Sequence, residues 1–75
     1  MVLTDVEAGK MVRVLLMNSG HGLEGKLRQL GIHSGGTVQI LRKAPFHGPV
    51  LLELDGREIA LGYGIAKKIM VEGIE

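Results

Sequence analysis

The stretch VLLELDGREIAL, residues 50–61, predicts two antiparallel strands joined by a tight turn. Asp55 and Gly56 favour a two-residue type I′ turn, in which both residues adopt positive φ. Such a turn places Val50, Leu52 and Leu54 opposite Leu61, Ile59 and Arg57. The register makes one face of the hairpin apolar. On the other face it places Glu53 opposite Glu58, a like-charge pair that is tolerable only in water, so we expect that face to be exposed.

Three further strand candidates lie on either side of this hairpin. Residues 37–43 directly precede it and place Val38 and Ile40 on one face of a strand. Residues 10–17 and 69–72 are also mostly apolar and rich in β-branched side chains. Glycine-rich turns separate these runs, which is typical of short antiparallel strands.

A short helix is predicted to begin at Leu23, because Leu23, Leu27 and Leu30 recur at the i, i+4 and i+7 spacing of one helical face. This apolar stripe indicates that Leu27 and Leu30 pack into the core. Gly31 ends the helix if it adopts the left-handed conformation. Ile32 can then fold back on Leu27, which is the hydrophobic contact of a Schellman cap.

The element order predicts the fold class. A chain of 75 residues is long enough for one domain, which we place over residues 1–75. Phe46 and Tyr63 are its only aromatic residues, so the core must consist of Leu, Ile, Val and Met. Five strands, one short helix insert and a helical turn over residues 62–68 indicate an all-β fold, a small SH3-like barrel that is partly open.

Composition and charge exclude several classes of protein. A formal charge of +1 and two aromatic residues argue against a nucleic-acid partner. The absence of cysteine excludes disulfides and thiolate zinc sites. Asp5 and Glu7 lie where a signal peptide would be basic and then apolar, and no apolar run reaches membrane-spanning length. We therefore expect a cytoplasmic protein that is not embedded in a membrane.

A glycine pattern resembles a nucleotide-binding motif. Gly20, Gly22 and Gly25 have the spacing G-x-G-x-x-G after a strand-like run. A dinucleotide fold also needs a long crossover helix and an acidic residue about twenty positions farther on. The predicted helix ends at Gly31, and the next acidic residue after Glu24 is Glu53. We therefore interpret the pattern as a turn and expect no nucleotide to bind.

The polar residues do not form a recognisable catalytic set. Ser19 and Ser34 lie near His21 and His33, but each pair falls in a glycine-rich turn without a third group to orient the base. We expect no enzymatic activity and no catalytic residues.

Metal binding is a separate question. His21, His33 and His47 all lie in predicted loops and lack the short fixed spacings of structural zinc sites. This pattern is explained by histidines that lie in solvent-exposed loops and bind no metal. A weak site for Fe(II) or another divalent transition metal, formed by His21 or His47 with a carboxylate, stays open as an alternative, and no cofactor is otherwise indicated.

Three segments together resemble the FeoA family, ferrous iron transport protein A. They are KLRQLGIHSGGTV (residues 26–38), APFHGP (44–49) and ALGYGIAKKIMVE (60–72). Their order and separation are more specific than any one of them alone, and the resemblance covers nearly the whole chain. The chain departs from the family pattern in having Lys26 in place of Arg and Leu61-Gly62 in place of Leu-Arg.

The resemblance implies an SH3-like barrel that acts as a small accessory to a FeoB-type membrane ferrous iron transporter, which has a cytosolic G-protein domain. Its role would be binding and regulation, without catalysis. Related domains end the metal-dependent repressors of the diphtheria toxin repressor type. A free-standing regulatory module of a metal-responsive transcriptional regulator is therefore the alternative. The sequence does not determine the oligomeric state.

Two segments are candidates for contacting such a partner. One is the predicted helix, through Leu23, Lys26 and Arg28. The other is the loop formed by Pro45, Phe46, His47, Gly48 and Pro49. Its two prolines interrupt strand pairing and limit the freedom of the chain around the only Phe. Phe46 either projects as an anchor for the partner or folds inward as core, and the sequence leaves both possibilities open.

Overall fold

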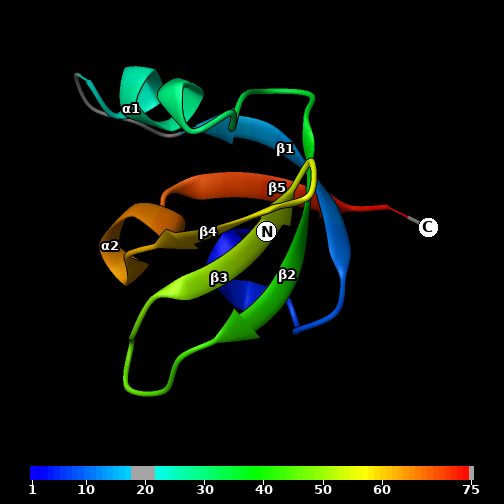
Figure 1. Ribbon diagram of the computed structural model, residues 1–75, viewed down its shortest axis with the longest axis vertical. Coiled ribbons are helices and arrows are strands. Elements are labelled where there is room, and N and C mark those ends of the chain that lie inside the picture. Colours follow the sequence, from blue (N-terminus) through cyan, green and yellow to red (C-terminus); the bar gives the residue numbers. More distant parts are fainter. Residues whose placement is uncertain (18–21, 75) are drawn as a thin grey trace.

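The computed structural model describes residues 1–17 and 22–74, and this part of the chain forms one five-stranded antiparallel sheet (Figure 1). The strands are β1 (Met11–Met17), β2 (Thr37–Lys43), β3 (Val50–Leu54), β4 (Arg57–Leu61) and β5 (Ile69–Gly73). Their order in the sheet is β4-β3-β2-β1-β5. Because β4 and β5 are opposite edges that do not pair within the described residues, the sheet is curved but not closed. The predicted all-β, SH3-like, partly open barrel is confirmed.

The β3–β4 hairpin has the predicted register. Leu52 lies opposite Ile59, and Glu53 lies opposite Glu58. The turn residues Asp55 and Gly56 have φ values of 51° and 80°, as a type I′ turn requires. Both glutamates are exposed to solvent, which weakens the repulsion between their like charges.

The helix α1 (Leu23–Gln29) ends in the predicted Schellman cap. The N–H of Ile32 donates to the carbonyl of Leu27, and the N–H of Gly31 donates to the carbonyl of Arg28, both at 2.9 Å. Gly31 has φ +94°. Leu27 is buried as predicted.

The prediction that Leu30 also belongs to the core is wrong. Leu30 is the C-cap of α1 and is 38% exposed. The Schellman turn brings Ile32 back over the helix and into the core, which leaves Leu30 at the surface. The Nη2 atom of Arg57 donates to the Leu30 carbonyl at 3.0 Å, which ties this end of α1 to β4.

The first six residues contribute to the core in a way that the sequence did not indicate. They contain a short 3₁₀ helix, η1 (Leu3–Asp5), and both Leu3 and Val6 are buried. The backbone of Met1 exchanges hydrogen bonds with Val71, donating at 3.2 Å and accepting at 2.7 Å. The N-terminal segment is thereby attached to β5.

The predicted helical turn after β4 is a short helix, α2 (Tyr63–Ala66). Its last residue, Ala66, is fully buried, whereas Tyr63 is only partly buried. The remaining core of the described residues is aliphatic, as the composition predicted, but it includes no methionine. It consists of Leu3, Val6, Val12, Val14, Leu27, Ile32, Val38, Ile40, Val50, Leu52, Leu54, Ile59, Leu61, Ile69 and Val71. No helix in the described residues has the length and apolar character needed to cross a bilayer.

Candidate functional site

The loop between β2 and β3 presents an aromatic ring to solvent. Phe46 is 99% exposed, so of the two possibilities left open by the sequence, the surface position is the correct one. Phe46 and His47 both have φ 59°, a left-handed conformation that is uncommon for residues with side chains. Two consecutive residues of this kind reverse the chain sharply and place Phe46 at the tip. In Figure 1 this loop forms the lower end of the molecule.

Backbone hydrogen bonds hold the loop in this conformation. The N–H of Ala44 donates to the carbonyl of Pro49 at 3.0 Å, and the N–H of Gly48 donates to the carbonyl of Pro45 at 3.1 Å. Each proline also has a restricted φ. The tip is therefore presented by a loop with few conformations to lose on binding.

Gly48 lets the two arms of this loop approach each other, so Gly48→Ala should be destabilising. A Cβ atom at Gly48 would lie 2.7 Å from the Cβ of Ala44 and 3.1 Å from the carbonyl oxygen of Pro45. We expect a loss of about 1 to 3 kcal/mol in urea denaturation, because the loop must shift to make room. Gly64→Ala in α2 is the matched control, because a Cβ atom added at Gly64 would meet no other atom within 4 Å and alanine favours a helix, so this variant should be at least as stable as the wild type. Equal stability of the two variants would show that the loop adapts freely.

Side chains tie the loop to its neighbours. The ring of His47 stacks on the ring of Tyr63, with centroids 4.3 Å apart and an interplanar angle of 14°. The Nζ atom of Lys67 lies 6.0 Å from the centroid of the Tyr63 ring. At the base of the loop, the Nζ atom of Lys43, the last residue of β2, donates to the carbonyl of Thr4 in η1 at 3.2 Å. The loop is thus in contact with α2, and the strand end that leads into it is in contact with η1.

The second predicted segment, α1, reaches the loop only through α2. Leu23 is partly buried against the core, and with Lys26 and Ile65 of α2 it lines an open hollow of about 300 Å³. In Figure 1, α1 and the loop lie at opposite ends of the molecule, with α2 between them on the same side. Arg28 is exposed on α1 but lies two positions beyond Lys26, and side chains at that spacing do not share a helix face.

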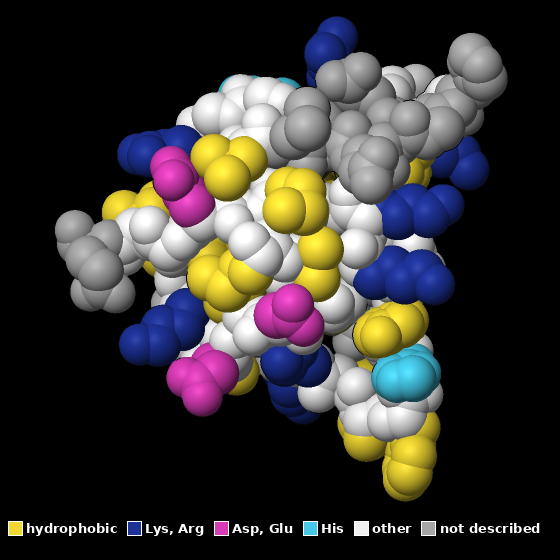
Figure 2. All heavy atoms as spheres, turned by 180° about the vertical axis from the view of Figure 1, so that it is seen from behind, with side chains coloured by type: hydrophobic (Ala, Val, Ile, Leu, Met, Phe, Trp, Pro, Cys, Tyr) yellow, Lys and Arg dark blue, Asp and Glu magenta, His cyan; other side chains and the backbone are white. Residues whose placement is uncertain are grey.

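We call the surface on the two sides of α2 the α2 face. It consists of two separate groups of residues: Phe46, His47 and Tyr63 with Lys67 beside the Tyr63 ring, and Leu23, Lys26 and Ile65. Figure 2 shows this side of the molecule at the right, where Lys and Arg side chains lie above a histidine and a hydrophobic tip. Sequence analysis predicted four of these residues and missed Tyr63 and Ile65 of α2 and Lys67, the C-cap of that helix. The only available signal was that Tyr63 is the second of two aromatic residues.

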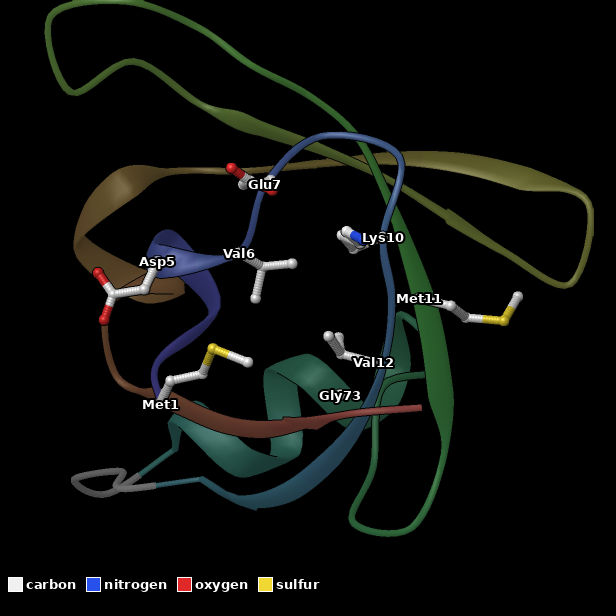
Figure 3. Close-up of a pocket in the computed structure, with 8 residues that line it drawn as sticks. All are labelled: Met1, Asp5, Val6, Glu7, Lys10, Met11, Val12 and Gly73. Atoms are coloured by element: carbon white, nitrogen blue, oxygen red, sulfur yellow. The ribbon is translucent and has the colours of Figure 1, made fainter. Parts of the chain in front are cut away.

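A different hollow lies at one end of the barrel and has a volume of about 290 Å³ (Figure 3). Its lining consists of Met1, Asp5, Val6, Glu7, Lys10, Met11, Val12 and Gly73. In the close-up, Met1 and Val6 point into the ring of strands and Met11 points away from it. The charged groups are of both signs, and the lining includes no serine, cysteine or histidine.

The two histidines in the described part of the chain, His33 and His47, lie beyond opposite ends of β2. His33 is exposed, with its Nδ1 atom 3.1 Å from the carbonyl oxygen of Ser34, and His47 stacks on Tyr63. His21, the other candidate ligand, lies outside the described residues, as does Ser19. Within the described part of the chain, no three His, Asp or Glu side chains are grouped so that they could hold a metal ion.

The glycine pattern is likewise only partly described, because Gly20 lies outside the described residues. Gly22 is the N-cap of α1 and has φ +86°. The helix that follows has seven residues and leads to β2, which pairs antiparallel with β1. A dinucleotide site requires a parallel crossover at this point.

Two comparisons with known proteins indicate the same family. The model of the FeoA domain matches residues 1–73. A protein of Methanocaldococcus jannaschii assigned as Fe(2+) transport protein A is 36% identical over 73 residues, which is 97% of this chain and 87% of that protein.

Two solved structures show where the same fold occurs. The iron uptake regulatory protein FeoA superposes with a TM-score of 0.85 at 29% identity, covering 96% of this chain and 93% of that one. The repressor ScaR with bound Zn²⁺ superposes with a TM-score of 0.89 at 28% identity, covering 99% of this chain but only 37% of ScaR. The fold therefore occurs both as a separate protein and as part of a longer metal-dependent repressor.

Proposed function

Because the chain belongs to the FeoA family, we propose that it is a cytoplasmic accessory protein of ferrous iron uptake that binds a FeoB-type membrane transporter. Its function is binding and regulation, and it catalyses no reaction. The surface that makes the contact is the α2 face. The observation that carries this proposal is the position of Phe46, which is almost wholly exposed at the tip of a constrained loop.

An exposed aromatic ring of this kind has the properties of a binding anchor. Hot spots in protein interfaces are enriched in large side chains that enter a pocket on the partner and lose contact with water. A constrained loop loses little conformational entropy when it binds. Since the core of this domain is complete without Phe46, folding does not explain why a phenylalanine occupies the tip.

A direct binding measurement tests the proposal. The full chain is immobilised, and the detergent-solubilised FeoB-type transporter of the same organism is passed over it. We expect saturable binding that is lost when the cytosolic domain of the transporter is removed. Equal signals from the intact and truncated transporters would contradict the proposal, as would no signal from either.

The structural similarity to ScaR supports a second candidate function. In that case the chain is a regulatory module that binds a metal-responsive repressor. A pull-down with the full chain as bait distinguishes the two, because recovery of the transporter supports the first function and recovery of a DNA-binding repressor supports the second.

We also propose that the isolated protein binds ferrous iron only weakly. Tight sites need several preformed ligands, and the described residues include no such group. Anaerobic calorimetric titration with Fe²⁺ should show no stoichiometric site, and His47→Ala should behave like the wild type. A tight site that disappears when both His21 and His47 are replaced by alanine would contradict this expectation.

A further inference from the structure

Positively charged residues lie at the base of the loop that carries Phe46 and beside the Tyr63 ring on which this loop stacks. Arg42 and Lys43 are the last two residues of β2 and are both exposed. They line two different hollows at the base of the loop, of about 180 and 240 Å³. Lys67 lies over the Tyr63 ring, on which His47 of the loop stacks. Lys43 therefore lines the same hollow as Phe46, Lys67 lies beside the Tyr63 ring of that hollow, and Arg42 lies at the base of the loop on the other hollow.

Within residues 1–17 and 22–74, none of Arg42, Lys43 and Lys67 forms an ion pair, whereas Arg13 is paired with Glu72 at 3.0 Å. Neither hollow at the base of the loop has a carboxylate in its lining. Asp5 and Glu7 instead line the hollow shown in Figure 3. Although the whole chain has a formal charge of only +1, the charged side chains in the linings of these two hollows are thus all positive.

We propose that the surface that receives Phe46 is an apolar pocket, large enough for one aromatic ring, with carboxylates at its rim. This inference rests on the proposed function and adds the chemistry of the site on the transporter. The ring of Phe46 fills the pocket, while the acidic rim faces Arg42, Lys43 and Lys67. Complementary charge of this kind orients two proteins and accelerates their association, and its effect decreases with salt.

An anionic lipid surface offers the same combination of apolar interior and negative charge, but the structure favours a protein. A single myristoyl chain gives an association constant with membranes of only about 10⁴ M⁻¹, and one phenylalanine ring is much smaller. A fluid bilayer also adapts to whatever is inserted into it, so a loop that only enters lipid does not need a fixed conformation. The hydrogen bonds of the Phe46 loop fix one shape, which is useful only against a pocket of matching shape.

Charge reversal tests the inference on the full chain with the cytosolic domain of the FeoB-type transporter as the binding partner. Lys43→Glu and Lys67→Glu are compared with Lys10→Glu, which makes the same change beside Asp5 and Glu7. We expect each of the first two to weaken binding at least fivefold at about 50 mM NaCl and much less at about 500 mM. Lys10→Glu should bind like the wild type. Vesicles of phosphatidylcholine with phosphatidylglycerol serve as the second partner and should not bind.

The outcomes separate this inference from the proposed function. If the wild type binds the domain but all three variants bind equally and salt has no effect, the acidic rim is contradicted while the function stands. Binding to the vesicles that is lost in Phe46→Ala would replace the protein pocket with a lipid surface. If the wild type does not bind the domain at all, the function and the inference fail together.

Discussion

Leu27→Ala is expected to destabilise the protein by about 2 to 5 kcal/mol, whether or not a partner is present. Leu27 is 1% exposed and is the α1 residue that lies fully in the core. Its carbonyl also accepts the N–H of Ile32 in the Schellman cap. Truncation leaves a cavity beneath a helix of only seven residues, which cannot hold its conformation without packing. A small domain with one core has little more stability than this to lose.

Leu30→Ala is the matched control, since it makes the same chemical change three residues farther along the same segment. Leu30 is 38% exposed, so its truncation should cost less than about 1 kcal/mol. Urea denaturation of both variants measures the difference. Equal losses would mean that α1 packs on the barrel through a different face from the one that the structure shows.

The hairpin and the helix cap were predictable because local chemistry determines them. A two-residue turn at Asp55-Gly56 leaves one register for the strands on either side, and the register then assigns every side chain to a face. The end of α1 is predictable in the same way. Glycine adopts the left-handed conformation without steric strain, so Gly31 by itself indicates where the helix stops. In both cases the determining residues are adjacent in the sequence.

The features that the sequence did not predict depend on contacts between distant residues. Val2 forms a bridge with Met70, and the stack of His47 on Tyr63 joins a loop to a helix beyond the next hairpin. No periodicity within a single segment encodes these pairings. Leu30 is a contact that periodicity predicted but the fold does not make. Its spacing matched the apolar stripe of the helix, yet the turn after the helix places Ile32 in the core and leaves Leu30 exposed.

The same limit applies to the candidate site. The two prolines and the lone phenylalanine identified the loop, but they could not decide whether Phe46 faces inward or outward. That depends on whether the aliphatic side chains of the strands, the helices and the N-terminal segment already fill the core, which they do. The role of α2 in joining the loop to α1 likewise became visible only in three dimensions.

Phe46→Ala is expected to weaken binding to the transporter by about 2 kcal/mol or more, which is about thirtyfold in Kd, without affecting the fold. The ring is 99% exposed, so its removal leaves no cavity in the protein. In the complex, the same change empties a pocket on the partner and exposes apolar surface that was buried there. Binding of the full chain to the solubilised transporter and thermal denaturation of the free chain are measured on the same variant.

The two measurements distinguish an anchor from a structural residue. A core phenylalanine would cost about 3 to 5 kcal/mol of stability on truncation, so a variant that melts far below the wild type would show that Phe46 packs inward in solution. A variant that melts normally but binds as tightly as the wild type would show that the contact lies elsewhere on the surface. Leu27→Ala gives the reverse pattern to the one expected for Phe46→Ala, with lower stability and, for the fraction that remains folded at low temperature, unchanged affinity. An anchor is therefore identified by lost affinity at full stability, a combination that no core substitution produces.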